Sequence, residues 1–394
     1  MVQTGPTAVV AGAGIAGLAS ALGLAQAGWQ VTVLERAAEL GEVGAGVALS
    51  RNGVASLRGL GLDDEAISSI GVSTRAGGTF DLRGGPIMPI EASAAHAEAV
   101  TMRGVYRPRL HDALLDRVRA HDVHVKTGAA VTDVVAGSPD GEQAVVTAGG
   151  TDHRADLVIA ADGVNSAVRT ALAPQQRPVY SGYSSWRAVV PVAIDPAVLT
   201  QYWGPHAEFG TMPVGPELTY WYGYVAMPQG SRLLDEHTAA RERFAGWAEP
   251  VRDIIDATPP AAVLRHDVVH LPGGMRRYHL GRVLAVGDAA HAMLPTMGQG
   301  AATALEDGVC VARLVAEPVA SGGELAGALA EFDAVRRPRC RTIARAALAS
   351  ALIGSHLGPF WQGARNALMR RTPSSVISRG AHAVMDWTPP PPRP

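Results

Sequence analysis

The sequence predicts an α/β fold: a Rossmann-type nucleotide-binding domain, an inserted antiparallel or mixed β-sheet lobe and C-terminal helices. Three observations support this prediction. An apolar run at 7–11 leads into the glycine pattern Gly12-Ala13-Gly14-Ile15-Ala16-Gly17. Two later apolar runs end in an Asp/Gly pair, at 162–163 and 287–288. Residues 180–224 hold ten of the twenty aromatic residues, so the composition changes there.

The first unit is a strand, a tight turn, a helix and a second strand. We expect the strand at Thr7–Ala11, the helix at Gly17–Ala27 and the next strand at Gln30–Leu34. This is the context in which the glycine pattern indicates dinucleotide binding.

Each glycine of the pattern has a physical role. Gly12 permits the tight turn, Gly14 lets the backbone approach a pyrophosphate, and Gly17 allows close packing of helix and strand. The helix N-terminus attracts the phosphates. Glu35, 23 residues after Gly12, is placed to accept ribose hydroxyls. The alternative is a glycine-rich turn that binds nothing.

The middle of the chain adds a helix and more strands. Residues 105–120 carry leucines at helical spacing. Residues 123–160 have the pattern of a β-meander, with strands at 123–125, 131–135 and 143–147 before a buried strand at Leu157–Ala161.

The aromatic region predicts a separate lobe. Prolines divide residues 180–224 into short strands, which favours an antiparallel sheet. Tyr220, Tyr222 and Tyr224 alternate onto one face of a strand at Leu218–Met227.

The chain then returns to nucleotide-binding features. Arg282–Val286 is predicted as a parallel-type strand, followed by a loop and a helix beginning near Ala301. Residues 333–385 are Ala- and Arg-rich and predict helix, and the tail Pro389–Pro394 is expected to be loose.

Composition limits the function. At 394 residues the chain is long enough for more than one lobe. Its formal charge, 34 − 36 = −2, argues against a nucleic-acid or anionic-membrane partner, which requires a concentrated basic face. Cys310 and Cys340 give neither a disulfide framework nor metal-ligand spacing, so we expect no metal and a reducing, cytoplasmic location. Ala346–Leu357 is too short to span a bilayer, and no signal peptide is evident at the N-terminus.

Three segments together resemble the single-component (group A) flavin-dependent aromatic hydroxylases. They are Gly12–Gly17 with Glu35, Ala161-Asp162-Gly163 with Arg169, and Gly287-Asp288 followed by Pro295 and Gly298-Gln299-Gly300. The resemblance covers roughly residues 7–335. Over this range the chain is similar to salicylate, 3-hydroxybenzoate and urate hydroxylases and to zeaxanthin epoxidase. It implies non-covalent FAD, transient NAD(P)H docking, and O₂ activation through a flavin C4a-hydroperoxide that hydroxylates an electron-rich aromatic or heteroaromatic small molecule.

The resemblance also implies roles for individual residues. Asp288 bonds the ribityl chain, the loop from Pro295 to Gly300 lies at the flavin pyrimidine edge, and Arg107 lies beside the flavin, with Arg109 as the alternative. His291 is expected to be structural. The full set of expected cofactor-binding residues is Gly12, Gly14, Ile15, Ala16, Gly17, Glu35, Arg36, Gly46, Val47, Arg107, Val131, Asp162, Asp288, Pro295, Gly298, Gln299 and Gly300.

Glu208, Tyr220 and Pro295 are the candidate catalytic residues. Glu208 stands where some relatives carry His or Arg, which disfavours an anionic acid as substrate and favours a neutral or cationic ring. It is then a candidate base toward an N–H or O–H group. The alternatives are a solvated strand residue for Glu208 and plain core packing for the aromatic cluster.

The expected domains are an FAD-binding domain (1–75, 105–175 and 273–335), a substrate lobe (76–104 and 176–272) and a C-terminal helical segment with its Pro-rich tail (336–394). Two rival functions remain open: an FAD-dependent epoxidase or reductase of the same fold, and a non-catalytic redox sensor. The protein is expected to be a monomer or homodimer.

Overall fold

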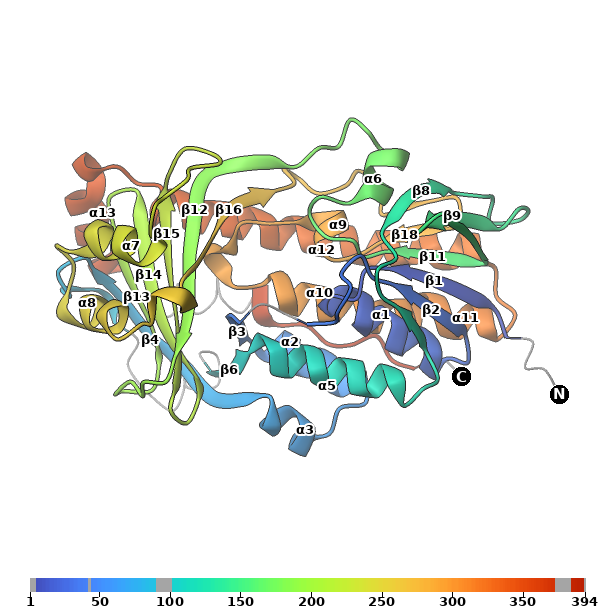
Figure 1. Ribbon diagram of the computed structural model, residues 1–394, viewed down its shortest axis with the longest axis horizontal. Coiled ribbons are helices and arrows are strands. Elements are labelled where there is room, and N and C mark those ends of the chain that lie inside the picture. Colours follow the sequence, from blue (N-terminus) through green and yellow to red (C-terminus); the bar gives the residue numbers. More distant parts are fainter. Residues whose placement is uncertain (1–4, 42–43, 90–100, 373–383, 393–394) are drawn as a thin grey trace.

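The computed structural model describes residues 5–41, 44–89, 101–372 and 384–392. Parts of the expected substrate lobe (90–100) and C-terminal segment (373–383) lie outside these residues. Three sheets and their helices lie along one long axis (Figure 1). A six-stranded sheet is at one end, a nine-stranded sheet is at the other, and a long helix, α12, runs between them.

The six-stranded sheet is of the parallel, nucleotide-binding type. Its order is β17-β18-β11-β1-β2-β7, and only β17 runs antiparallel to its neighbour. The strands are β1 (Thr7–Ala11), β2 (Gln30–Leu34), β7 (His124–Lys126), β11 (Leu157–Ala160), β17 (His279–Leu280) and β18 (Val283–Ala285). β1, β11 and β18 are almost continuously buried, as expected for strands covered on both faces.

Helices cover one side of this sheet. α1 (Ile15–Gln26) packs against α5 (Arg107–Arg119) and α10 (Gly300–Cys310). The predicted helices are therefore confirmed, although α1 begins two residues before Gly17, inside the glycine pattern. α10 continues through the π-helical η3 (Val311–Ala316) into α11 (Glu317–Ala320).

The expected β-meander is partly wrong. Its first strand, β7, instead pairs in parallel with β2 at the edge of the six-stranded sheet. The helix α5, which precedes β7, packs on α1 and returns the chain from the nine-stranded sheet to the open edge of β2. The true meander is β8 (Val131–Val135), β9 (Ala144–Ala148) and β10 (Thr151–Ala155), and the turn Gly149-Gly150 joins its last two strands.

The nine-stranded sheet forms the second lobe and is mixed, as predicted. Its order is β16-β12-β15-β14-β13-β4-β6-β3, with β5 paired to β4, and only the β13–β4 pair is parallel. The strands are β3 (Gly46–Leu49), β4 (Gly71–Asp81), β5 (Pro86–Pro89), β6 (Thr101–Tyr106), β12 (Val179–Val190), β13 (Leu199–Gly204), β14 (Ala207–Gly215), β15 (Leu218–Ala226) and β16 (Leu264–His270).

The two faces of this sheet differ. One face packs Trp186, Phe209 and Trp221 against α7 (Glu236–Phe244) and α8 (Glu249–Asp256). The opposite face carries the alternating tyrosines of β15, and we call it the tyrosine face. Through β3 and β6 the sheet continues to α5, so the tyrosine face is joined directly to the nucleotide-binding side.

The remaining helices connect and cover these sheets. They are α2 (Arg51–Gly59), α3 (Asp64–Ser69), α6 (Ala167–Leu172), η1 (Pro260–Ala262), α9 (Asp288–His291), η2 (Pro295–Met297), α12 (Leu325–Ile353), η4 (Pro359–Trp361) and α13 (Gln362–Arg371). None of the described helices is both long and apolar enough to cross a membrane.

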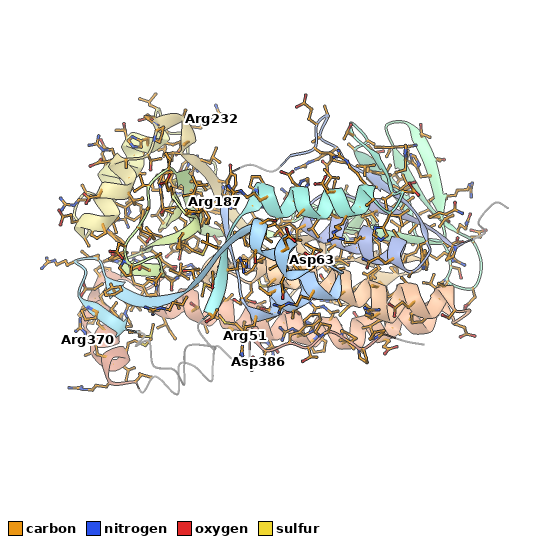
Figure 2. All side chains as sticks on the ribbon, turned by 90° about the horizontal axis from the view of Figure 1, so that it is seen from below. Arg51, Asp63, Arg187, Arg232, Arg370 and Asp386 are labelled. Carbon is orange, nitrogen blue, oxygen red and sulfur yellow. The ribbon has the colours of Figure 1, made fainter. Side chains whose placement is uncertain are left out.

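The segment just before the Pro-rich tail packs against the rest of the protein. Val384 is 2% exposed, and Trp387 packs against the core of the nucleotide-binding side. Asp386 forms an ion pair with Arg51 at the start of α2 (Figure 2). Apolar burial and this ion pair hold the segment down.

Candidate functional site

The glycine turn presents an open helix N-terminus. Gly12 has φ +104°, and a Cβ atom on Gly17 would lie 1.9 Å from the Gly12 carbonyl oxygen, so both positions require glycine. Gly14 caps α1 without a side-chain hydrogen bond, and a Cβ there would meet nothing within 4 Å. The first amides of α1 therefore face open space, the arrangement that suits a pyrophosphate.

Glu35 is bound to this turn. Its Oε2 accepts a hydrogen bond from the Ala13 amide at 2.8 Å, and its Oε1 accepts one from the Ala37 amide at 2.9 Å. The carboxylate thus fixes the loop and keeps free lone pairs for hydroxyl donors. Arg36 beside it is exposed, and Val131 lies half-buried on β8.

Three distant segments meet at this turn. A Cβ on Gly287 would lie 2.6 Å from the Ala16 side chain. The buried Arg169 guanidinium donates to the carbonyl oxygens of Val164 and Ala289, which ties the second segment to the third. Burial lowers the pKa of Arg169, and Asp162 and Asp288 act in the opposite direction. The two carboxylates are therefore near the same guanidinium.

One carboxylate oxygen of Asp162 lacks a hydrogen-bond donor among the described residues. Its Oδ2 accepts a hydrogen bond from the Val168 amide at 3.1 Å, whereas its buried Oδ1 has no hydrogen-bond partner among the described residues. Asp288, the first residue of α9, is exposed. A buried orphan acceptor and an exposed carboxylate next to an open helix N-terminus fit the hydroxyl groups and pyrophosphate of FAD.

The loop after α9 is anchored by a side chain. Gln299 is 1% exposed, its Nε2 donates to Ser50 Oγ at 3.2 Å, and its Oε1 accepts from Asn52 Nδ2 at 3.0 Å. The side chain thus holds the loop to α2, which leaves the backbone free to face a cofactor. Gly298 has φ +62°, and Gly300 begins α10. Pro295 is exposed at the first position of η2.

His291 is structural, as expected. Its Nε2 lies 2.6 Å from Asp307 Oδ2, which also accepts the Gly287 amide, and Asp307 Oδ1 accepts from Arg336. Burial lowers the pKa of His291, but Cys340 and Asp307 outweigh burial and raise it well above the usual value. His291, Asp307 and Cys340 are the ligand types of a metal site that their sequence spacing does not reveal. The Arg336 guanidinium already supplies the positive charge there.

Arg107 rather than Arg109 faces the tyrosine face. Arg107, the first residue of α5, and Arg187 of β12 both act to lower the pKa of Tyr220, although burial raises it overall. Figure 2 shows Arg187 near the start of α5. Arg109 is exposed and lies over the Tyr106 ring.

Glu208 is buried on the tyrosine face, which excludes the solvated alternative. The residue is 3% exposed. Its Oε1 accepts hydrogen bonds from the Tyr222 hydroxyl at 2.6 Å and from Gln201 Nε2 at 2.9 Å, and the Ser355 hydroxyl is a further neighbour of the carboxyl group. Burial raises the pKa of Glu208 to about 7, although Tyr222, Gln201 and Ser355 lower it in part. No cation contributes to this shift.

Tyr220 links this group to the cofactor side. Its ring stacks on Tyr222 at 6.1 Å between centroids. A Cβ on Gly46 of β3 would lie 2.3 Å from Tyr220 Cγ, so the glycine is needed for the close approach. Val47 follows, half-buried, on the same strand. Tyr220 and Glu208 do not touch each other in register, because Tyr220 pairs with Met212.

Sequence reasoning missed Tyr222 and Gln201 as partners of Glu208. The alternation of Tyr220, Tyr222 and Tyr224 already placed Tyr222 on the correct face. Gln201 had no comparable signal, because its position depends on the β13–β14 pairing.

The C-terminal segment completes the tyrosine face. The His356 ring stacks on Tyr183 with centroids 3.9 Å apart, and His356 Nε2 lies 3.1 Å from the Tyr224 hydroxyl. Leu294 and Met297, on either side of Pro295, pack in the same cluster of side chains. The FAD-side loop, the tyrosine face and the end of α12 therefore adjoin one another.

Comparison with known proteins agrees with this geometry. The family model of the FAD binding domain matches residues 6–347. The chain is 35% identical over 391 residues to "Aurachin C monooxygenase/isomerase" of Stigmatella aurantiaca, covering 98% of this chain and all of that protein. It is 30% identical to "2-heptyl-3-hydroxy-4(1H)-quinolone synthase" of Pseudomonas aeruginosa, covering 95% and 96%. Klebsiella pneumoniae HpxO, solved with FAD and uric acid, superposes with a TM-score of 0.85 at 27% identity and 97% coverage of both chains.

Proposed function

This chain belongs to the FAD binding domain family as an FAD-dependent monooxygenase, and we propose that its substrate is a neutral aromatic or heteroaromatic ring that carries an N–H or O–H group. When bound, FAD supplies the redox chemistry, taking electrons from NAD(P)H and delivering one oxygen atom of O₂ to the ring. The chain's own residues bind, orient and deprotonate that ring.

The residues described above would hold the cofactor. The open N-terminus of α1 would receive the pyrophosphate, and Glu35, Asp162 and Asp288 would accept hydroxyl groups. The amides around Gly298 and Gly300 at the start of α10 stabilise negative charge, because a helix N-terminus carries partial positive charge.

Glu208 carries the proposal. Glu208 is a buried carboxylate on the accessible tyrosine face, its known hydrogen-bond partners are all neutral, and it is therefore suited to accept a proton or hydrogen bond from a ligand. The hydrogen-bond partners of Glu208 are neutral, so its own ionised form would repel an anionic group placed directly against it. With a pKa near neutrality, Glu208 is suited to general-base catalysis.

A proton taken from the ring's N–H or O–H makes the ring more electron-rich, which favours oxygen insertion. Tyr222 and Gln201 hold the Glu208 carboxyl group in place through Oε1. Tyr220 and Tyr222 are half-buried, so their rings retain accessible surface for stacking. The relative's name, 4(1H)-quinolone, denotes a ring of this neutral N–H type.

The test is oxygen incorporation from ¹⁸O₂ with a matched panel of rings. We expect product from a 4-quinolone with a free N–H, much less from its N-methyl analogue, and none from salicylate. Glu208→Gln should slow product formation on the N–H substrate by roughly 10²–10⁴-fold while FAD stays bound. Glu217→Gln, an exposed glutamate in the β14–β15 turn, is the matched control.

Efficient turnover of salicylate, or an unchanged rate in Glu208→Gln, contradicts the proposed substrate class. Analysis of the same products distinguishes hydroxylation from epoxidation and from reduction without oxygen insertion.

We further propose a cytoplasmic location, which the two buried free cysteines support. We also propose that the protein is a monomer or homodimer that acts on a small molecule.

A further inference from the structure

We propose that the C-terminal helices of this enzyme dock on an anionic phospholipid bilayer, next to the substrate site. The C-terminal apolar surface consists of Leu348, Leu352, Ile353, Phe360, Trp361 and Leu368. These are six of the twelve most exposed large hydrophobic side chains in the described part of the chain, and they fall within 21 residues. Scattered exposed leucines need no explanation, whereas such a concentration indicates an interaction surface.

The exposed residues lie along two outward helix faces. On α12, Leu348 and Leu352 follow the exposed Arg345 at spacings of three and four, so the three share one face. On η4 and α13, Phe360 is 83% exposed and Trp361 is 59% exposed, and Leu368 is 68% exposed two turns later. Figure 1 places α13 at the end of the molecule far from the N-terminus.

Positive charge surrounds this surface. From Ala334 to Met385 the sequence has nine arginines and no acidic residue. Some of these arginines turn inward, because Arg336 and Arg339 pair with Glu306. Arg345 and Arg371, by contrast, are exposed and form no ion pair within the described residues. The C-terminal region therefore has an excess of basic residues, although the net charge of the whole chain is close to zero.

A bilayer fits this chemistry better than a second copy of the chain. Exposed Trp, Phe and Leu next to arginines are what a helix lying in the membrane interface presents. Basic residues add attraction to anionic headgroups. A symmetric dimer through the same surface would bring the exposed Arg345 and Arg371 of both copies into one interface, and residues 334–385 supply no acidic residue to pair with them.

The surface adjoins the substrate site. The segment from Gly354 to Gly358, which joins α12 to η4, brings His356 against Tyr183 and Tyr224 and places Ser355 next to Glu208. We therefore infer that docking supplies lipophilic rings from the bilayer. This second step rests on the proposed function, whereas docking itself does not.

The experiment is co-sedimentation of the full-length, FAD-loaded enzyme with vesicles. We expect binding to equimolar phosphatidylglycerol/phosphatidylcholine vesicles and weak binding to phosphatidylcholine alone, with salt weakening the former. The double variant F360S/W361S should lower partitioning roughly tenfold or more. Arg345→Gln and Arg371→Gln should each lower it roughly fivefold. Leu234→Ser, which removes a fully exposed leucine before α7, is the matched control.

Three results would overturn docking. They are no binding to anionic vesicles at low salt, equal binding by F360S/W361S and the wild type, and a wild-type dimer in solution that F360S/W361S dissociates. Flavin absorbance and the thermal midpoint verify that each variant is folded, and Leu368→Ser alone tests the surface if the double variant loses FAD. Because no turnover is measured, failure here leaves the proposed substrate class untouched.

Discussion

At the scale of single residues, burial and hydrogen bonding shift the pKa of Glu208 in opposite directions. Burial makes its ionised form costly, and hydrogen bonds from Tyr222 and Gln201 recover only part of that cost, so its pKa rises to about 7. A carboxylate that served packing alone would be better replaced by an apolar residue. Its position beside an accessible aromatic face suits the proposed role as a general base.

Glu208 should therefore make stability depend on pH. Its folded pKa of about 7 lies above its ordinary value, so the native state binds the proton more tightly than the unfolded state. The resulting stability is present below about pH 4.5 and is lost as pH rises through 7. The loss is on the order of 3 kcal/mol, since each pKa unit corresponds to about 1.4 kcal/mol.

Glu208→Gln removes this titration. Unfolding free energies measured from pH 5 to pH 8 should fall for the wild type and for Glu217→Gln, and should change less for Glu208→Gln. Parallel profiles for all three proteins would show that Glu208 ionises freely in the folded state.

Single residues also show where sequence reasoning ends. The functions of Gly12, Gly14 and Gly17 follow from local backbone geometry, which a motif encodes directly. The contacts of Glu208 depend on pairing between β13, β14 and β15, and the contact of Gly46 with Tyr220 joins strands some 170 residues apart. Such contacts are fixed by tertiary packing and leave no local pattern.

At the scale of elements, one buried network joins α10 to α12. Arg336 of α12 donates to Asp307 Oδ1 at 2.7 Å and also to Glu306, and Asp307 in turn receives the Gly287 amide that begins the α9 turn. All three charged side chains are fully buried. The network fixes the turn that carries Asp288 relative to the two helices.

Arg336→Leu should be strongly destabilising, because it removes the buried guanidinium that pairs with both Glu306 and Asp307 and leaves them only Arg339 and His291 as charged partners. We expect a loss of about 3–5 kcal/mol in the free energy of unfolding. Arg337→Leu is the matched control, because its ion pair with Asp333 is partly exposed and should contribute at most about 1 kcal/mol. Denaturant unfolding of both variants measures the difference, and equal losses would contradict a special role for the network.

Elements with strong periodicity were predictable, and those defined by their partners were not. β1, α1 and α10 followed from apolar runs and glycines. β7 was misplaced because three residues carry no signal that distinguishes a parallel edge strand from a meander. The burial of Val384 and the packing of Trp387 against the core were not predicted, because these contacts depend on tertiary structure and leave no local pattern.

At the scale of the whole molecule, the proposed cofactor site combines segments near residues 14, 162 and 288. Protein contacts such as those of Arg169 already hold the three together. FAD would bridge them further, so binding should stabilise the entire fold by mass action. The stabilisation is about 2.7 kcal/mol at a hundredfold excess over Kd.

We therefore expect the thermal midpoint to rise with FAD concentration and all of the flavin to be released by acid precipitation, as non-covalent binding requires.

Asp288→Ala should shift the FAD dependence of the thermal midpoint to higher concentration by roughly 10- to 150-fold, the equivalent of about 1.5–3 kcal/mol for one charge-assisted hydrogen bond. Its midpoint without FAD should match the wild type, because Asp288 is exposed. Asp140→Ala, at an exposed turn aspartate, should leave both midpoints unchanged. Flavin retained on the acid pellet, or an Asp288→Ala titration that overlays the wild type, would show that the third segment does not hold FAD through this carboxylate.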